Sequence, residues 1–317
     1  MPDALIVIPC LNEEDHIGAL ANQFAKNNPD TLIVIVDGGS TDQTVQIAEG
    51  LAANNPNIKY LHNPDRIQSA AVNRAIKTYG GDLKYLIRVD AHAEYPDDYC
   101  NILIADAEKT HAASVVVPMH TIGKDPFQRA VAAAQNSLLG NGGSAHRTIG
   151  KEGKWVDHGH HALIRINAFR AMAGYDEKFS HNEDAELDAR LIRARYRIWL
   201  TGKTFLTYYP RTESWSLFCQ YFNYGNGRAR NILKNRLKPK ARQLAPAAVL
   251  PAIILALFGF TLPMLIWFFA CLAFGICLAV QVQDRWIALS GPAAMLMHLG
   301  WSCGFWAGIA SNPRRIL

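Results

Sequence analysis

The distribution of charge divides this chain of 317 residues into two parts suited to different solvents. No Asp, Glu, Lys or Arg occurs between Arg242 and Asp284, and none occurs between Arg285 and Arg314. Charge-free apolar stretches of this length are typical of membrane segments, whereas residues 1–213 have the mixed composition of a globular domain. A basic run precedes the first apolar stretch: Arg228, Arg230, Lys234, Arg236, Lys238, Lys240 and Arg242.

This pattern predicts a globular domain followed by a membrane domain. The predicted segments are a globular domain at 1–213, an aromatic and basic interfacial segment at 214–243, a membrane domain at 244–310 and a short tail at 311–317. Residues 244–282 are long enough for two tight spans with a break near Thr261-Leu262-Pro263. Residues 286–310 form either a third span or a re-entrant or interfacial segment. The basic run places the globular domain in the cytosol and suits an anionic membrane surface better than nucleic acid.

Cysteine usage and the N-terminus agree with a cytosolic globular part. The six cysteines include no CxxC pair, so the sequence predicts neither a zinc site nor a disulfide framework. The N-terminus shows no basic region followed by a long apolar core, so no secretory signal is visible.

Short apolar runs alternate with helical segments through the first part, which predicts a parallel α/β layer. The helices after the first two strands are expected to begin at Asn12-Glu13-Glu14 and at Asp42, the second capped by Ser40 or Thr41. Residues 141–144 and 150–154 are expected to be loops. Strands are predicted at residues 4–9, 31–36, 58–61, 85–89 and 115–117.

Two of the predicted strands end on an aspartate. Asp37 begins the turn Asp37-Gly38-Gly39-Ser40-Thr41-Asp42, and Asp90 is followed two residues later by His92. In open α/β sheets ligands bind beyond the carboxyl ends of the strands, where a phosphate-bound divalent cation could be held. Asp37 could accept bonds from a nucleobase or ribose. The alternative is that Asp37 belongs to an ordinary turn and Asp90 is a capping residue at a strand end.

Two polar clusters follow. Asp157-His158-Gly159-His160-His161 is interpreted as a strand entry whose histidines bond a polar acceptor, in preference to a metal site. His181-Asn182-Glu183-Asp184-Ala185-Glu186-Leu187-Asp188 opens a helix, and the carboxylates of its first turn suit the positive end of the helix dipole. One of these carboxylates could instead serve as a general base.

Four motifs in order make residues 1 to about 235 resemble family 2 glycosyltransferases, which have a GT-A nucleotide-sugar-binding fold. They are Ile8-Pro9-Cys10-Leu11-Asn12-Glu13-Glu14, Val36-Asp37-Gly38-Gly39-Ser40-Thr41-Asp42, Arg88-Val89-Asp90-Ala91-His92 and Asn182-Glu183-Asp184. The segments RVDAHAEYP and YGNGRAR are similar to membrane-bound glucosyltransferases of bacterial exopolysaccharide assembly, such as the succinoglycan enzymes.

The resemblance implies a role for each matching residue. Pro9, Glu13 and Asp37 would line the uridine pocket with Arg66 as a neighbour. Asp90 would hold the nucleotide and, with His92, a divalent cation, either Mn²⁺ or Mg²⁺. His92 stands where the family has a second Asp, and imidazole suits Mn²⁺ better than Mg²⁺. Asp184 would be the catalytic base, and the residues implied near the acceptor are His160, Glu183, Arg228 and Arg230.

The implied reaction is an inverting, metal-dependent transfer of a single sugar at the bacterial cytoplasmic membrane. The implied donor is a UDP-sugar, with UDP-glucose favoured, and the implied acceptor is a saccharide on a polyprenyl diphosphate. Processive members of the family carry a Gln-x-x-Arg-Trp motif, and the Trp is missing near Arg228 and Arg230, which favours addition of one sugar. Two alternatives are a polyprenyl-phosphate sugar transferase and a non-catalytic membrane scaffold subunit.

Overall fold

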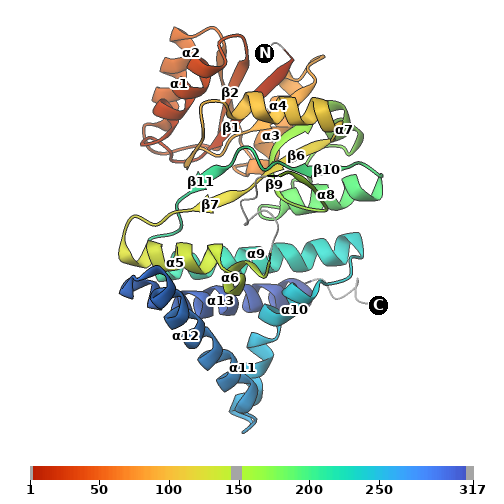
Figure 1. Cartoon of the computed structure of the whole chain (residues 1–317). Coiled ribbons are helices and arrows are strands. Elements are labelled where there is room, and N and C mark those ends of the chain that lie inside the picture. The colour runs from red at the N-terminus through yellow and green to blue at the C-terminus, as the bar shows by residue number, and fades with distance from the viewer. Residues whose placement is uncertain (1–2, 144–151, 312–317) are drawn as a thin grey trace. The chain divides into compact units, whose positions relative to one another are not determined.

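A computed structural model describes residues 3–143 and 152–311 (Figure 1). The chain divides into two compact units, the first formed by residues 1–119 and 149–207 and the second by residues 120–148 and 208–317. The sequence did not predict that residues 120–148 join the C-terminal helices. The four predicted segment boundaries stay predictions. Residues 312–317 of the predicted tail, and residues 144 and 150–151 of the predicted loops, lie outside the described residues.

The first unit is built around an eight-stranded sheet with the order β3-β2-β1-β4-β9-β6-β10-β8. Its strands are β1 (Ala4–Cys10), β2 (Leu32–Asp37), β3 (Ile58–His62), β4 (Tyr85–Arg88), β6 (Ser114–Val117), β8 (Lys154–Val156), β9 (His160–Arg165) and β10 (Ile198–Leu200). Strand β1 pairs in parallel with β2 and β4, β2 with β3, and β6 with β10. Strand β9 runs antiparallel to both β4 and β6, and β8 runs antiparallel to β10. The prediction of a mainly parallel α/β sheet is therefore confirmed.

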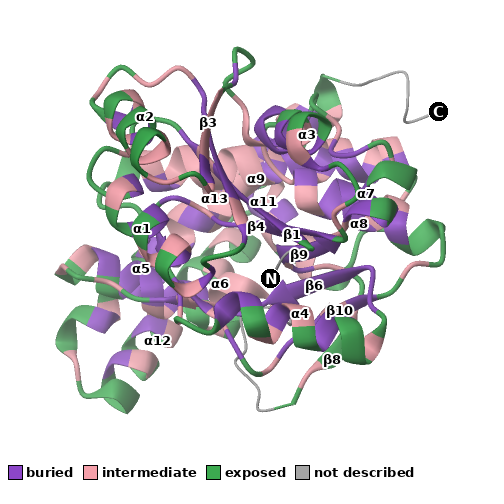
Figure 2. Ribbon diagram, turned by 90° about the horizontal axis from the view of Figure 1, so that it is seen from above, coloured by how far each residue is buried: buried purple, intermediate pink, exposed green. Residues whose placement is uncertain are grey.

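The helices of the first unit follow its strands along the chain. They are α1 (Ile17–Asn27), α2 (Thr44–Asn54), α3 (Gln68–Tyr79), α4 (Tyr99–Thr110), α7 (Ile166–Ala171) and α8 (Glu183–Arg193). Strands β1, β4 and β6 are buried almost throughout, as Figure 2 shows, because both faces of the sheet are covered. A small sheet has the order β5-β11-β7, with β5 at Ala93–Glu94, β7 at Met119–Thr121 and β11 at Leu206–Tyr208, and the unit boundary falls within β7 and β11.

Two predicted helix starts are wrong. Helix α1 begins at Ile17, not at Asn12–Glu14, and α2 begins at Thr44 without a side-chain cap from Ser40 or Thr41. The polar groups of the two loops bond each other instead. The Asn12 amide donates to Ser40 Oγ at 2.8 Å, the Thr41 amide donates to Asn12 Oδ1 at 2.8 Å, and the Glu13 amide donates to Thr44 Oγ1 at 2.7 Å. Asn12 adopts a φ of 55°, which turns the chain away from a helix.

Within the described residues of the second unit, the regular elements are helices apart from the ends of β7 and β11. Its elements are α5 (Pro126–Asn136), α6 (Leu138–Asn141), α9 (Ser214–Asn235), α10 (Ala241–Ala247), α11 (Val249–Leu257), α12 (Leu262–Val282), the 3-10 helix η2 (Arg285–Leu289) and α13 (Ser290–Ala310). Helix α9 continues through Gly225-Asn226-Gly227 without a break. Helices α9 and α13 lie side by side, while α11 and α12 leave them and converge on a tip (Figure 1).

Glycines allow α9 and α13 to approach each other closely. Gly300, Gly304 and Gly308 recur every fourth residue of α13, so they share one helix face. A Cβ on Gly304 would collide with the carbonyl oxygen of Phe222, and one on Gly300 would lie 2.6 Å from the carbonyl oxygen of Phe218. Spacing of this kind is common where helices pack closely in membrane proteins.

The predicted break near Thr261–Pro263 is confirmed between α11 and α12. Gly259 has a φ of +91°, and the amide of Phe260 returns to the carbonyl of Leu255 at 3.1 Å to end α11. Of the described helices, only α12 is both long and apolar enough to cross a membrane by itself, while residues 241–257 form a shorter apolar stretch. Large side chains are exposed around the tip, including Leu257 at 80% and Phe258 at 76%.

Replacing Gly304 by Ala should destabilise the protein by about 1–3 kcal/mol, because the added methyl group meets a backbone carbonyl that cannot rotate away. Thermal unfolding of the full chain in detergent measures the effect. Gly50→Ala is the control. Gly50 lies in exposed helix α2 with nothing within 4 Å of the added Cβ, so alanine there should stabilise by up to about 1 kcal/mol. Equal effects of the two substitutions would contradict the close packing of α9 on α13.

Candidate active site

The carboxyl ends of β1, β2 and β4 bring three polar loops to one edge of the sheet. In the register of the strands, Cys10 lies beside Asp37 and Val7 beside Arg88. The loops also bond each other, since Glu13 Oε1 lies 2.9 Å from Nδ1 of His92. This is the edge at which open α/β sheets bind ligands, as the sequence predicted for these loops.

The carboxylate of Asp37 stabilises the turn that it begins. Its carboxylate accepts hydrogen bonds from the amides of Gly39 at 2.8 Å and Ser40 at 3.2 Å and from Ser40 Oγ at 2.5 Å. Gly39 has a φ of +83°, and a Cβ there would lie 3.6 Å from Nε of Arg66. Pro9 lies half-buried near the end of β1. The sheet edge thus brings Pro9, Asp37 and Arg66 to one region, and their roles in binding uridine stay predictions.

Asp90 is surrounded by donors and positive charge. Its Oδ1 accepts a bond from Nε2 of Gln68 at 2.9 Å, and its Oδ2 lies 3.3 Å from Nε2 of His160. Burial by itself would raise the pKa of Asp90, but Arg88, His160 and His92 together lower it below its usual range. Asp90 is therefore ionised at every physiological pH, as a cation ligand must be.

The buried side chain of Arg88 joins Asp90 to the start of α8. Its Nη1 lies 3.3 Å from Oε1 of Glu183 and its Nε lies 3.6 Å from Oδ1 of Asp90. The nearby carboxylates outweigh burial and raise the pKa of Arg88 above its usual value, so the guanidinium stays charged. Arg88 belongs to the motif Arg88–His92, but the sequence predicted no role for it. Its position two residues before the strand-end Asp90 was the sequence feature that could have indicated a role at the site.

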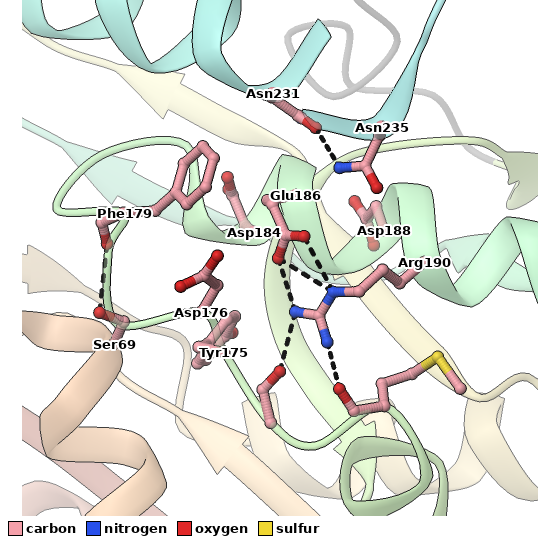
Figure 3. Close-up of polar contacts among 12 residues, drawn as sticks. Ser69, Tyr175, Asp176, Phe179, Asp184, Glu186, Asp188, Arg190, Asn231 and Asn235 are labelled. Atoms are coloured by element: carbon pink, nitrogen blue, oxygen red, sulfur yellow. Dashed lines mark hydrogen bonds and ion pairs between the residues drawn. The ribbon is translucent and has the colours of Figure 1, made fainter. Parts of the chain in front are cut away.

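The acidic start of α8 separates into carboxylates with different surroundings. Glu186 is fully buried and paired with Arg190, which also donates to the carbonyl of Gly174 at 2.8 Å (Figure 3). This pairing makes Glu186 structural. Glu183 is buried against Arg88, whereas Asp184 is only half-buried. Asp184 is thus the one of these three carboxylates that is not buried, and its role as base stays a prediction.

Glu183 and Asp184 have opposite pKa shifts. Burial and the neighbouring charge of Asp184 raise the pKa of Glu183 to about 7. Burial would also raise the pKa of Asp184, but His158, His161, Arg88 and His160 lower it below the ordinary value. Adjacent carboxyl groups whose pKa values are shifted in opposite directions are typical of sites where one of them must be ionised. The ionised member at neutral pH is Asp184.

The three histidines of the Asp157–His161 cluster each lie against a carboxylate. His160 faces Asp90, and His158 and His161 both bond Asp188, the last at 2.7 Å. This confirms the prediction that these histidines bond polar acceptors. Within residues 3–143 and 152–311, no group of three or more His, Cys, Asp or Glu side chains could by itself hold a metal ion. The sequence placed Asp188 in the segment that opens α8 but predicted no role for it, although its spacing of four residues from Asp184 places both on one helix face.

Arg228 and Arg230 lie in α9, and therefore in the second unit. The site described above is confined to the first unit. Their predicted role near the acceptor stays a prediction.

This fold, a mainly parallel sheet with acidic loops at its carboxyl edge, is the GT-A fold of glycosyltransferases. Residues 5–172 match the model of glycosyl transferase family 2. The chain belongs to this family and is a glycosyltransferase enzyme, as its motifs predicted.

Individual relatives agree with this assignment. The chain is 53% identical to the succinoglycan biosynthesis protein ExoA of Rhizobium meliloti over 320 residues, which cover 99% of this chain and 97% of the relative. It is 26% identical, over 72% of this chain and 74% of the relative, to the dolichyl N-acetyl-alpha-D-glucosaminyl phosphate 3-beta-D-2,3-diacetamido-2,3-dideoxy-beta-D-glucuronosyltransferase of Methanococcus voltae.

A solved structure supports the same fold. It is the mannosyltransferase PcManGT from Pyrobaculum calidifontis in complex with GDP-Man and Mn²⁺, which matches with a TM-score of 0.61 at 16% identity. The match covers 95% of this chain and 87% of that one. The predicted GT-A fold and the resemblance to the succinoglycan enzymes are both confirmed.

The raised pKa of Glu183 predicts a dependence of stability on pH. A folded-state pKa of about 7, above the ordinary 4.5, means that the folded chain holds the proton more tightly. This stabilisation is complete below about pH 4.5 and is lost as the pH rises to about 7. Relative to Glu183→Gln, which cannot titrate, the free energy of unfolding of the unmodified chain should fall by about 3 kcal/mol across this range.

Urea unfolding of the full chain in detergent, followed by tryptophan fluorescence between pH 4.5 and 7.5, measures this difference. Glu49→Gln on the exposed face of α2 is the control and should leave the pH dependence unchanged. A Glu183→Gln variant with the same pH dependence as the unmodified chain would contradict the raised pKa.

Proposed function

We propose that this enzyme is an inverting glycosyltransferase that moves one glucose from UDP-glucose to a saccharide carried on a polyprenyl diphosphate in exopolysaccharide synthesis. The observation that carries the proposal is the position of Asp184. It is an ionised, half-buried carboxylate at the start of α8, and the chain Glu183–Arg88–Asp90 joins that turn to the donor edge of the sheet. The identity of ExoA as a succinoglycan biosynthesis protein supports the exopolysaccharide context.

The donor would bind along the carboxyl edge of β1, β2 and β4. Pro9, Glu13, Asp37 and Arg66 would hold the uridine, and Asp90 would face the diphosphate. The solved relatives bind nucleotide sugars or nucleotides, among them GDP-Man, UDP and UDP-GlcNAc, which supports this class of donor. The choice of glucose rests on the resemblance to the succinoglycan glucosyltransferases.

Asp90 and His92 are the residues that would hold a divalent cation. Asp90 stays ionised, and the contact of His92 Nδ1 with Glu13 holds the imidazole at the same edge of the sheet. Two protein ligands fit a cation whose other ligands are the phosphates of the donor, and imidazole favours Mn²⁺. A bound cation would neutralise the charge that develops on the leaving diphosphate.

Asp184 would act as the general base. It would accept the proton of the acceptor hydroxyl as that oxygen attacks the anomeric carbon from the face opposite the diphosphate. The carbon–oxygen bond to the diphosphate breaks in the same displacement, so an α-linked donor yields a β-glycoside. His160 and Glu183, which adjoin Asp90 and Arg88, would border the region of the acceptor.

The proposed acceptor is linked to a lipid, so the enzyme would meet it at a membrane surface. The relative from Methanococcus voltae is named for a sugar carried on dolichyl phosphate, which supports a lipid-linked acceptor. The apolar surface of α11 and α12, which no charged residue interrupts, would insert into the bacterial cytoplasmic membrane. Arg228, Arg230 and the basic residues after them would lie at the anionic leaflet that carries the acceptor.

Asp184→Asn should lower transfer at least about 10²-fold while donor binding stays nearly unchanged, because a general base contributes this much and the donor loops lie elsewhere. The assay measures UDP release and lipid-linked product from a panel of UDP- and GDP-sugars with Mn²⁺, Mg²⁺ or EDTA. The full chain is held in lipid nanodiscs. Metal-dependent release that is highest with UDP-glucose and rises with a polyprenyl-diphosphate saccharide is the expected result.

The matched control is Asp98→Asn, because Asp98 is an exposed aspartate whose side chain makes no capping bond to α4. It should retain full transfer. Full activity of Asp184→Asn would remove Asp184 from the mechanism. Transfer to a polyprenyl monophosphate that survives Asp184→Asn would point instead to a polyprenyl-phosphate sugar transferase, because a phosphate acceptor hardly needs a base.

A Phe258→Asp, Ile266→Asp double variant should reduce binding to vesicles at least about 10-fold, because each charge is costly within the hydrocarbon core. Both side chains are exposed, at 76% and 61%. Flotation of the full chain with phosphatidylethanolamine and phosphatidylglycerol vesicles measures binding. Leu138→Asp is the control, because Leu138 is 68% exposed but lies on α6, outside helices α11 and α12. Equal flotation of all three proteins would contradict insertion through α11 and α12.

A further inference from the structure

Helices α11 and α12 form an apolar hairpin that projects from the other helices of the second unit (Figure 1). Its turn is residues 258–261, and no Asp, Glu, Lys or Arg occurs between Arg242 and Asp284. In this part of the chain, which the structure describes throughout, no residue from 254 to 270 is buried. Phe260, within the turn, is 68% exposed. Such a surface suits lipid, and the length of the two arms indicates how far it reaches into a bilayer.

The two arms of the hairpin are too short to cross a bilayer. Helix α11 has nine residues, which at about 1.5 Å per residue extend over about 14 Å. Helix α12 is longer, but its buried residues begin at Cys271, so only residues 262–270 form a free arm of the same length. Each arm thus reaches across about half of the roughly 30 Å hydrocarbon core. Even with α10 included, residues 241–257 would extend over only about 25 Å.

Both arms of the hairpin end against the same helix, α13. At the first arm, the amide of Leu250 donates to Ser302 Oγ at 3.0 Å, and this hydroxyl donates to the carbonyl oxygen of Ala247 at 3.0 Å. At the second arm, α12 comes so close to α13 that a Cβ on Gly291 would lie 2.5 Å from the carbonyl oxygen of Cys271. The chain therefore leaves α13 along one arm and returns to it along the other.

Charged residues flank the hairpin at both of these ends. Arg242 lies in α10, before the first arm, and Asp284 lies two residues after α12. Asp284 pairs with Arg129 of α5, and α5 packs against both η2 and α13. Because charged groups are costly in the hydrocarbon core, the polar boundary of the membrane should lie at the level of α13 for both arms.

Helix α13 itself runs along a charged helix. Gly300 packs against the backbone of Phe218 and Gly308 against the backbone of Asn226, so α13 follows α9 for more than two turns. Helix α9 carries three basic residues, Arg228, Arg230 and Lys234. A helix with these charges is costly within hydrocarbon, so α9 and the helix packed along it belong outside the core. This favours the interfacial alternative for residues 286–310 over a third span.

The turn of the hairpin has the backbone bonding that hydrocarbon demands. A backbone amide without a partner is costly in the bilayer core. The amides of Phe258 and Phe260 both donate to the carbonyl oxygen of Leu255, at 3.0 and 3.1 Å, and the amide of Gly259 between them is also bonded, at 3.1 Å. Pro263, in the first turn of α12, has no amide hydrogen to satisfy. The turn can therefore lie in lipid without leaving these amides unpaired.

We propose that the α11–α12 hairpin enters the membrane from one side, turns within the hydrocarbon and returns to the same side. Its partner is then the acyl chains of a single leaflet, and α9 and α13 lie on one side of the membrane. The described chain is attached to the membrane without crossing it. The inference rests on the part of the proposed function that places α11 and α12 in the membrane, and it does not depend on the reaction.

Thiol labelling in membranes of an expressing bacterium tests this arrangement. A membrane-impermeant maleimide is added to spheroplasts, which expose the outer face, or to inverted vesicles, which expose the cytosolic face, and mass spectrometry locates the label. Lys238→Cys, between α9 and α10, and Ala310→Cys, at the end of α13, should react only in inverted vesicles. Phe258→Cys should react at least about 10-fold less than these in either preparation, because the reactive thiolate does not form in hydrocarbon.

Each other labelling pattern contradicts the proposal. Reaction of Phe258→Cys in spheroplasts would mean that the chain has two spans, and reaction of Ala310→Cys there would mean a third. Reaction of Phe258→Cys in inverted vesicles at the rate of Lys238→Cys would place the turn in water. The three replaced side chains are exposed, so the variants should fold. Full reaction of Phe258→Cys after denaturation in detergent shows that its thiol is competent.

The depth of the turn is measured with Val280→Cys as the matched control. Val280 is 72% exposed and Phe258 is 76% exposed, but Val280 lies near the end of α12 that returns to α13. Each thiol carries a bimane, and the full chain is placed in liposomes with nitroxide lipids. A nitroxide near the end of the acyl chain should quench position 258 at least about 2-fold more than one near the headgroup, and position 280 should show the reverse order. The same order at both positions would overturn the inference.

The inference and the proposed function fail in different ways. If the labelling pattern is as expected but no nucleotide sugar is turned over, the proposed reaction fails and the inference stands. If sugar transfer is found and Phe258→Cys reacts in spheroplasts, only the inference is overturned.

Discussion

The buried guanidinium of Arg88 is the interaction on which the rest of the site depends. A charge with so little exposure must be paired, and one of its two partners comes from a distant part of the chain. Asp90 follows Arg88 by two residues. Glu183 begins helix α8, 95 residues after Arg88. Arg88 therefore ties the donor edge of the sheet to the turn that carries Asp184. Its charge also keeps Asp90 ionised despite burial.

The antiparallel strand β9 brings the histidines into this arrangement. It lies between β4 and β6, so the residues at its start, His160 and His161, reach the end of the sheet where β4 finishes. One histidine then faces Asp90 and another faces Asp188. A parallel strand in this place would begin at the opposite edge of the sheet. The reversal of one strand thus decides which charges surround Asp184.

In the second unit, close packing of helix backbones matters more than the pairing of charges. Gly300, Gly304 and Gly308 let α13 lie directly against the backbone of α9. Helices α11 and α12 remain apolar and largely exposed, which suits a solvent of lipid. The same chain therefore combines a sheet that needs buried ion pairs with helices that avoid charge altogether.

Local patterns in the sequence were sufficient for much of this architecture. The apolar runs predicted β1, β2, β3, β4 and β6 and a mainly parallel order, and the motifs around Asp37, Asp90 and Asp184 predicted the family, because both depend on residues close together in the chain. The charge-free stretch predicted the apolar helices and the break near Thr261–Pro263 for the same reason. The starts of α1 and α2 were wrong, because Asn12 and Ser40 bond each other across 28 positions.

Only the tertiary structure decided which carboxylate has which partner. Glu183, Asp184, Glu186 and Asp188 are alike in sequence, since all are acidic residues in the first six positions of one helix. Arg88 pairs with Glu183, Arg190 with Glu186, and the histidines with Asp188, which leaves Asp184 as the half-buried member. Local spacing could not predict this, because the energy of a charge depends on burial and on partners that the fold brings from other strands.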